Sequence, residues 1–259
     1  MPRIAVVHLV RKRNGLAPLQ GFLESYRRHA AGVPHELIVL YKGFGKDVPT
    51  DHAQALAGIS HQRMFLPDRG FDLHPYFAAL ARFDHEFFCC LNSFSRILSA
   101  DWLAKLHAPL ASRSAGLVGA TGSCESLAAL PAPKRWITQR YFAPFPNHHL
   151  RTNAFMAARG VLARVTLRPV LFKFFALAFE SGKDGLTAQI GRLGFDALVV
   201  DRNGTAYARD RWHLANTFRQ SLQEDLLVSD NQTDAYAAAD AVTRARLSRL
   251  AWGKWARPA

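Results

Sequence analysis

Apolar and polar residues alternate along the first 120 residues in blocks that predict strands and helices in turn. The apolar runs that predict strands are residues 4–10, 36–41, 63–66, 86–91 and 117–120. The amphipathic stretches that predict helices are residues 16–31, 50–58, 73–83 and 101–111. Near-continuous apolar strands are typical of a sheet covered on both faces, and the alternating order favours parallel neighbours with right-handed crossovers. This half therefore predicts an α/β fold, in which ligands bind beyond the carboxyl ends of the strands.

The composition of the chain changes between residues 126 and 151, where four prolines interrupt any long helix or strand: Pro131, Pro133, Pro144 and Pro146. We interpret this stretch as the seam between two halves of one domain, residues 1–125 and 126–220. After it, strands are expected at 152–158 and 197–200, and helices at 162–179 and 185–193. A polar stop at Asp230 is read as the N-cap that precedes a terminal helix at 235–255, so residues 221–259 are expected to form a C-terminal helical extension.

The charge of the chain narrows the classes of ligand. Its 259 residues carry a formal net charge of +13, and 49% of them are hydrophobic, which excludes a disordered chain. The longest basic run is only Arg11, Lys12 and Arg13, and the other basic residues are spread singly, unlike a phosphate-tracking nucleic-acid surface. We therefore expect no nucleic-acid partner and favour an anionic small molecule or an anionic membrane surface.

The cysteines and the apolar runs bear on the compartment. Cys89, Cys90 and Cys124 show neither metal-ligand spacing nor a disulfide framework, and no apolar run reaches the length of a membrane span. The N-terminus lacks the apolar stretch of a signal peptide. We expect a cytoplasmic protein that meets a membrane, if at all, peripherally at its inner face. Trp252 and Trp255 lie among basic residues, and either touch a membrane surface or pack on their own domain.

Two nucleotide-binding motifs are absent from the sequence. After the first expected strand the chain has one glycine, Gly15, where a dinucleotide fingerprint needs three, and no P-loop occurs. Nicotinamide cofactors and P-loop chemistry are therefore disfavoured.

Four segments follow successive expected strands or begin the next helix: residues 10–14, the strand end at 40–43, the segment 68–72, and the run Asn92-Ser93-Phe94-Ser95 with Asp101-Trp102-Leu103 after it. In order and position these segments resemble the GT-A type of glycosyltransferase over most of residues 4 to 220. The resemblance implies a mixed, mainly parallel sheet sandwiched by helices, with a nucleotide-binding first half. It also implies that the nucleotide sugar contacts Val10, Arg11, Asn14, Lys42, Asp72, Asn92, Ser93 and Ser95.

The chain departs from that family at the metal-binding DxD motif. Asn92-Ser93-Phe94 stands where two carboxylates would hold a divalent cation, so we assign no metal ligand. Mn²⁺ or Mg²⁺ is the cation that the resemblance implies. Either the enzyme is metal-independent and uses Arg or Lys on the diphosphate, or the protein binds a sugar nucleotide without turnover. In a third interpretation, Asn92 and Ser95 only cap the following helix.

The segment from residue 179 to 195 resembles the family signature that carries the general base of inverting members. The acidic pair of that signature falls on Gly182 and Lys183, so the candidate catalytic carboxylates are the neighbouring Glu180 and Asp184. Glu180 follows the apolar stretch 174–179. An ordinary helix N-cap is the alternative role for Asp184.

Polar and aromatic residues in the second half are candidates for contacts to the acceptor or the diphosphate. They are His149, Arg151, Trp212, His213 and Arg219. Trp212 either offers a stacking face to a sugar ring or fixes the C-terminal helix to the body. His149 and Arg151 otherwise belong to a solvated loop. Diphosphate neutralisation without a cation would depend on Arg11, Arg151, Arg209 and Arg219.

These observations predict a glycosyltransferase that moves a sugar from a nucleotide-diphosphate donor to a saccharide or lipid-linked saccharide acceptor, a role that fits bacterial surface polysaccharide biosynthesis. The alternative is a non-catalytic GT-A-like protein that binds sugar nucleotides or acts as a scaffold. A basic α/β module for nucleic acid is a third hypothesis, and its binding would weaken steeply with salt.

Overall fold

The structure is a computed structural model that describes residues 3–69, 71–112, 114–129, 135–170 and 172–257. Gly70, Pro131 and Pro133 of the sequence interpretation lie outside these residues. No described helix has the length and apolar character that crossing a membrane requires.

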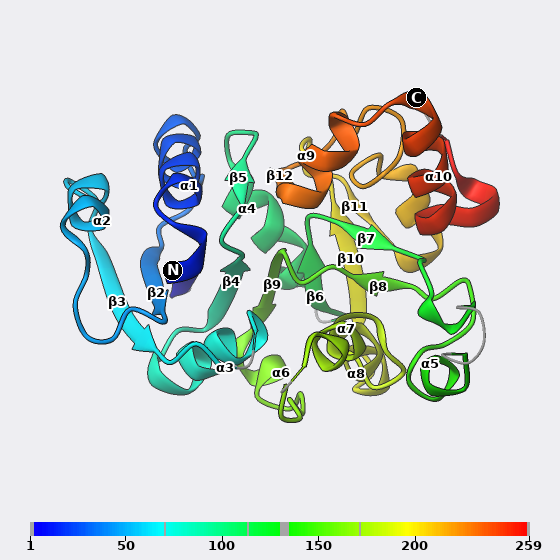
Figure 1. The fold of residues 1–259 in the computed structure, drawn as a ribbon, viewed down its shortest axis with the longest axis horizontal. Helices are drawn as coiled ribbons and strands as arrows, with labels where there is room; N and C mark the ends of the chain where they lie inside the picture. The colour runs from blue at the N-terminus through cyan, green and yellow to red at the C-terminus, as the bar shows by residue number, and fades with distance from the viewer. Residues whose placement is uncertain (1–2, 70, 113, 130–134, 171, 258–259) are drawn as a thin grey trace.

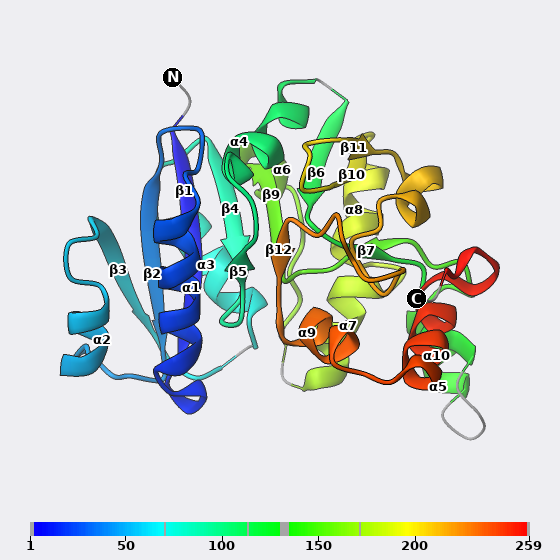
Figure 2. The same cartoon turned by 90° about the horizontal axis from the view of Figure 1, so that it is seen from above.

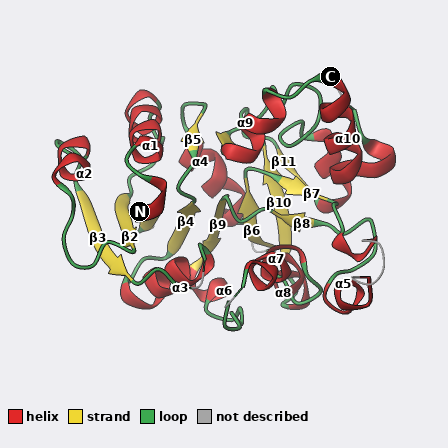
Figure 3. Ribbon diagram, viewed as in Figure 1, coloured by secondary structure: helices red, strands yellow, loops and turns green. Residues whose placement is uncertain are grey.

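An eight-stranded mixed sheet runs through the described residues in the order β11-β10-β6-β9-β4-β1-β2-β3 (Figures 1 and 3). Its strands are β1 (Ile4–Arg11), β2 (Glu36–Lys42), β3 (His61–Leu66), β4 (Phe87–Leu91), β6 (Ala115–Gly119), β9 (Ala154–Ala158), β10 (Asp196–Val200) and β11 (Ala206–Tyr207). β1 lies parallel to β2 and β4, and β2 lies parallel to β3. β9 runs antiparallel to both β4 and β6, while β10 is parallel to β6. The mixed, mainly parallel sheet expected from the sequence is confirmed.

Helices cover both faces of this sheet (Figure 1). The helices are α1 (Ala17–Arg28), α2 (Thr50–Ala55), α3 (Leu73–Arg82), α4 (Trp102–His107), α5 (Arg135–Tyr141), α6 (Arg159–Leu162), α7 (Lys173–Ser181), α8 (Leu186–Arg192), α9 (Asn231–Ala237) and α10 (Ala241–Trp252). Along β1, Val7 and Leu9 pack in the buried cluster that includes α3, α7 and α8, whereas Val6 and Val10 pack in the cluster that includes α1 and α4. Because successive strand residues point to opposite faces, an unbroken apolar strand feeds two cores.

Two of the long helices expected from the sequence are wrong. The stretch 162–179 is not one helix, because α6 ends at Leu162 and α7 begins at Lys173. Pro169 lies between them, and a proline has no backbone N–H to continue a helix. The terminal helix is two helices, since α9 ends at Ala237 and Asp240 caps the start of α10 by accepting a hydrogen bond from the Thr243 N–H at 2.7 Å.

The C-terminal segment packs directly on the body of the protein. β12 (Val228–Ser229) pairs with β5 (Arg96–Ile97), and the Trp252 indole N–H donates to the Phe218 carbonyl oxygen at 2.6 Å. A further two-stranded sheet joins β7 (Gly122–Ser123) to β8 (His149–Leu150). Viewed from above, α9 and β12 lie across the middle of the main sheet (Figure 2). The extension therefore reaches the end of the sheet where the site lies, although its boundary at 221 stays a prediction.

Candidate functional site

The carboxyl ends of β1, β2, β4 and β6 meet at one edge of the sheet, because these strands run in the same direction. The antiparallel strand β9 starts at this edge, so the residues that precede it, 151–153, lie there too. We call this place the strand-end site. It coincides with the region where ligands of open α/β sheets bind.

An ionic cluster occupies the strand-end site beyond β1 and β2. Arg11 donates to Asp68 at 2.9 Å and to Asp72 at 3.4 Å, and its own side chain is 9% exposed. The Lys42 ammonium lies 3.8 Å from Asp68 and donates to the backbone oxygen of Phe71. Lys42 is fully buried, so it does not contact a nucleotide sugar directly, contrary to what the sequence interpretation expected. It holds the loop that carries Asp68 and Asp72 instead.

Burial and charge shift three pKa values in this cluster in different ways. Burial, reinforced by Arg11, lowers the pKa of Lys42 to about 8. Burial raises the pKa of Asp72. The hydrogen bond from Arg11 lowers the pKa of the more exposed Asp68. Val10 is buried in the core and Asn14 is half-buried. The exposed cations directly after β1 are Lys12 and Arg13.

Asn92 closes a turn at the end of β4. Its side-chain oxygen accepts from the Phe94 N–H at 3.0 Å and from the Ser95 hydroxyl at 3.1 Å. Ser95 is completely buried and also donates to the Asn153 carbonyl oxygen at 3.1 Å. It therefore supports the turn and cannot contact a nucleotide sugar. Ser93 is 3% exposed, and its hydroxyl has no partner among the described residues. The capping interpretation of Asn92 and Ser95 therefore describes their local geometry, with a turn in place of a helix.

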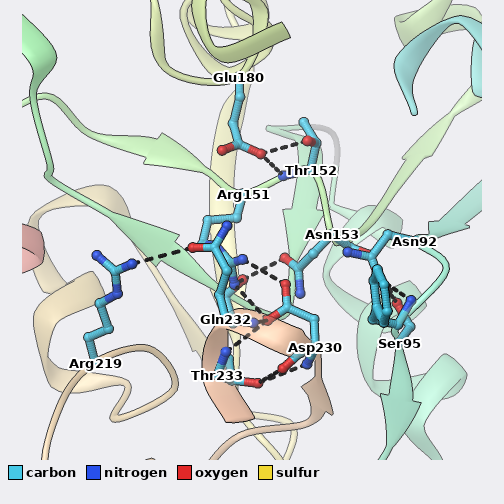
Figure 4. Close-up of polar contacts among 12 residues, drawn as sticks. Asn92, Ser95, Arg151, Thr152, Asn153, Glu180, Arg219, Asp230, Gln232 and Thr233 are labelled. Carbon is cyan, nitrogen blue, oxygen red and sulfur yellow. Dashed lines mark hydrogen bonds and ion pairs between the residues drawn. The ribbon is translucent and has the colours of Figure 1, made fainter. Parts of the chain in front are cut away.

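A buried ion pair lies beyond the ends of β6 and β9. Arg151 donates to Asp230 at 2.6 Å, and the two side chains are 5% and 1% exposed (Figure 4). Asp230 also accepts from the N–H groups of Gln232 and Thr233, so it caps α9 as the sequence predicts. Burial acts to raise the pKa of Asp230, but Arg151 and the two N–H donors outweigh it, and the pKa is lowered.

Glu180 enters the strand-end site from α7. One of its carboxylate oxygens accepts from both the N–H and the hydroxyl of Thr152, at 2.7 Å and 2.6 Å (Figure 4). His149 is 7% exposed, and its Nδ1 lies 2.8 Å from the Asn147 carbonyl oxygen. Burial lowers the pKa of His149, and the negative charge of Glu180 opposes that shift. The sequence interpretation named Glu180 as a candidate base, a role that stays a prediction, and it missed Thr152, the hydrogen-bond partner of Glu180.

The arginines expected to neutralise a diphosphate are already paired. Arg151 pairs with Asp230, Arg11 with Asp68 and Asp72, and Arg219 donates to Glu125 at 2.9 Å while only 14% exposed. The fourth, Arg209, is exposed and begins a 3₁₀ turn. The sequence interpretation expected arginine side chains that are free to bind a diphosphate, but Arg11, Arg151 and Arg219 are each paired with a carboxylate.

Three other candidates make their contacts elsewhere. Trp212 is 1% exposed and donates to the Tyr207 carbonyl oxygen at 3.1 Å, so it is a core residue and cannot stack on a sugar. His213 stacks on Trp255 with ring centroids 5.3 Å apart. Asp184 lies in the loop before α8, where it pairs with Arg192 at 3.2 Å, and the N-cap of α8 is Gly185. The N-cap role for Asp184 is therefore wrong.

The described residues do not fit a carboxylate-held metal at the DxD position. They contain no group of three or more His, Cys, Asp and Glu side chains that can hold a metal ion. The Asn92 oxygen is used within its own turn, and the carboxylates of Asp72 and Asp230 face arginine. We derive no chemical step through a cation here.

No local motif marks which pairs of residues meet across this site. Thr121 donates to the Asn153 side chain at 2.8 Å, and Asp230 reaches Arg151 from 79 residues away. The available signals were a polar residue two positions after β6 for Thr121, and a polar run directly before β9 for Thr152 and Asn153.

Comparison with known proteins identifies the fold. The sequence matches no protein-family model and no curated protein. Among solved structures, the mannosyltransferase PcManGT from Pyrobaculum calidifontis, in complex with GDP-Man and Mn²⁺, matches with a TM-score of 0.51 at 15% identity over 92% of this chain. Glucosyl-3-phosphoglycerate synthase from Mycobacterium tuberculosis, with Mg²⁺ and uridine diphosphate, matches with a TM-score of 0.45 at 17% identity, covering 74% of this chain and 66% of that one.

The likeness to the mannosyltransferase defines the class of fold. The chain has the GT-A type of fold that its element order predicted, with the mixed sheet sandwiched by helices. The match spans 65% of the length of the mannosyltransferase. Because fold does not imply function, activity has to be argued from the strand-end site.

Proposed function

We propose that the protein is a glycosyltransferase that moves a sugar from a nucleoside-diphosphate donor to a hydroxyl group of a saccharide acceptor, free or lipid-linked. The observation that carries this proposal is the Glu180 carboxylate, held by two hydrogen bonds from Thr152 at the strand ends of a GT-A fold. A positioned carboxylate at the ligand-binding edge is what a general base requires. Assembly of bacterial surface polysaccharide is the setting that we propose for this reaction.

Glu180 is the group that we assign to proton transfer. The acceptor hydroxyl oxygen bonds to the anomeric carbon, the bond from that carbon to the diphosphate oxygen breaks, and the hydroxyl proton passes to Glu180. The nucleoside diphosphate leaves with the electron pair of the broken bond. Thr152 fixes one carboxylate oxygen, and the other makes no hydrogen bond among the described residues. Asp184 is the weaker candidate, because its side chain is 66% exposed and its partners are Arg192 and Arg168.

The cations that we assign to the donor phosphates are Lys12 and Arg13, which replace the paired arginines of the sequence interpretation. Both follow β1 directly and are exposed, and their side chains make no hydrogen bond or ion pair within the described part of the chain. Arg13 lies within electrostatic range of Asp68 and Asp72. Guanidinium groups bind phosphate oxygens bidentately. A metal ion is therefore not required to neutralise the phosphate charge for binding.

A second candidate function, a protein that binds sugar nucleotides without turnover, is favoured by one observation. Asn92 stands at the position of the family's carboxylates, and its side-chain oxygen is committed to Phe94 and Ser95. Such a protein would keep the donor pocket and lose the leaving-group chemistry.

The test is release of nucleoside diphosphate from a panel of sugar nucleotides, with and without Mn²⁺, alongside thermal-shift measurements with the same compounds. A transferase releases diphosphate from at least one donor. A binding protein is stabilised by a donor without release. The absence of both a shift and release would contradict both functions. Arg13→Ala should weaken donor binding, whereas Arg28→Ala on the exposed face of α1 should not.

A further inference from the structure

A cationic cavity lies away from the strand-end site, between α5, α7, α8 and the chain that precedes α7. Its volume is about 620 Å³. Its charged lining residues are Arg140, Arg168, Lys183, Arg192 and Asp184. Four cations thus face one carboxylate, and an excess of positive charge in a cavity attracts an anionic group.

Three of the four cations of this cavity contact protein oxygens. Arg192 donates to the Lys183 carbonyl oxygen at 2.8 Å, and Lys183 donates through its ammonium to the Gln139 carbonyl oxygen at 2.7 Å. Asp184 pairs with Arg192 at 3.2 Å and lies 3.8 Å from Arg168. The Arg140 side chain, on α5, makes no hydrogen bond or ion pair with any described residue. The charge that Asp184 does not neutralise is therefore available to phosphate oxygens.

The cavity and Glu180 lie on different faces of α7. Phe175, Ala178 and Phe179 line the cavity, and at about 100° per residue they are about 140°, 160° and 100° around the helix from Glu180. Glu180 points to Thr152 at the strand ends. The cavity is consequently a separate site, and a molecule bound in it does not reach the proposed base.

Large apolar side chains stand in solvent around this cavity. Trp136 is 82% exposed, Ile137 is 60% exposed and Phe172 is 66% exposed. Trp136 and Ile137 precede Arg140 by four and three residues on α5, so they share its face of the helix. Phe172 lies 6.3 Å, ring to ring, from Phe175 in the cavity wall. Figures 1 and 2 show α5 beside α7, where the Tyr141 and Phe174 rings meet with their centroids 5.0 Å apart.

We propose that α5 and this cavity form a docking surface for an anionic lipid bilayer, with a headgroup phosphate in the cavity and Trp136, Ile137 and Phe172 in the interfacial layer. Exposed aromatic and aliphatic side chains beside arginine and lysine are what the membrane interface binds. A symmetric contact between two copies would bring the same cations together, which argues against a second chain as the occupant. This surface replaces the Trp252 and Trp255 expectation, because Trp252 is 1% exposed in the core. The inference does not rest on the proposed transferase activity.

The experiment is co-sedimentation of the full chain with vesicles of phosphatidylcholine alone and of phosphatidylcholine mixed with phosphatidylglycerol. Binding is expected only to the anionic vesicles and should weaken with added salt. Of the five tryptophans, Trp136 is the one that is mostly exposed, so its emission should shift to shorter wavelength on binding. That shift should vanish in Trp136→Phe.

Two variants and their matched controls test the surface itself. Arg140→Ala should reduce partitioning about fivefold, and Trp136→Ser about tenfold, because each removes one interfacial contact. Arg246→Ala and Val242→Ser make the same kinds of change on α10, where Val242 is 81% exposed, and should leave partitioning unchanged. All four positions are exposed, so the melting temperature should stay constant.

Three results would overturn the proposal. One is equal loss of vesicle binding in the α10 variants. Another is the absence of binding to anionic vesicles combined with either of two results. Thermal stabilisation by glycerol phosphate would make the cavity a site for free phosphate, and binding of RNA would make it a site for nucleic acid. The third is a dimer in solution that Trp136→Ser converts to a monomer.

Discussion

Replacing Asp230 by asparagine should destabilise the protein by about 3 kcal/mol, because it leaves Arg151 buried without its counter-charge. The two side chains are 5% and 1% exposed and 2.6 Å apart, so water cannot solvate the remaining guanidinium. The Phe218 ring, 4.2 Å from the guanidinium carbon, recovers only part of the loss. Asparagine still caps α9, which isolates the effect of charge.

The size of the effect can be separated into its parts with three further variants. Asp230→Ala also removes the cap of α9 and should cost about 1 kcal/mol more than Asp230→Asn. Combining Arg151→Met with Asp230→Asn removes both charges and should restore most of the stability. Asp84→Asn is the matched control, because Asp84 pairs with Arg3 but is 74% exposed and should contribute below about 1 kcal/mol.

The assay is urea unfolding followed by circular dichroism, with the slope of each transition compared between variants. A loss below about 1 kcal/mol in Asp230→Asn, or a double variant that is less stable than either single one, would refute this account of the ion pair. The pKa of Asp230 is lowered in the folded protein, so its contribution is full above the ordinary pKa of a carboxyl group. That contribution should fade as the pH falls through the folded pKa, in the wild type only.

Two further predictions concern the core and the base-bearing helix. His8 is fully buried and stacks on Phe22 with ring centroids 3.7 Å apart, and burial lowers its pKa to about 3. Below pH 6.5 the His8 side chain is therefore protonated in the unfolded chain and stays neutral in the folded chain. Stability should therefore fall by about 2 kcal/mol between pH 6.5 and pH 5 relative to His8→Leu, measured by urea unfolding; parallel curves for the two proteins would contradict this. A Cβ atom on Gly182 would clash with the Ala178 carbonyl oxygen, whereas nothing lies within 4 Å of one on Gly191. Gly182→Ala should thus destabilise the end of α7 by at least about 1 kcal/mol and Gly191→Ala should be neutral or stabilising in thermal unfolding, and the reverse order would count against the geometry.

The alternation of elements was predictable because each strand of the first half is an unbroken apolar run. Residues 4–10 and 36–41 became β1 and β2 with one residue added to each. The helix expected at 162–179 failed because apolar content on both sides of Pro169 hid the break, and periodicity alone cannot show which residues leave a helix. Two-residue strands such as β5 and β12 depend on each other across the chain and carry no local pattern.

The strand-end site was predictable in position and less so in content. Arg11 lies at this edge because it ends β1 and topology sets where strand ends lie, whereas Glu180 reaches the same edge from α7. Whether an arginine there is free depends on a partner distant in sequence, and neither Asp230 for Arg151 nor Glu125 for Arg219 is marked by any local motif. Trp212 shows the same limit, since a tryptophan beside polar residues fits a ligand site or a core, and only packing decides.

The comparison of Glu180→Gln with Asp184→Asn tests the central claim most directly. With a donor that the wild type turns over, Glu180→Gln should lower kcat by about 10² or more while donor binding is retained, because the amide still fits beside Thr152 but takes no proton. Asp184→Asn, on an exposed loop, should stay within about twofold of the wild type. A Glu180→Gln protein with wild-type kcat, or a loss of kcat confined to Asp184→Asn, would contradict the assignment of Glu180 as the base.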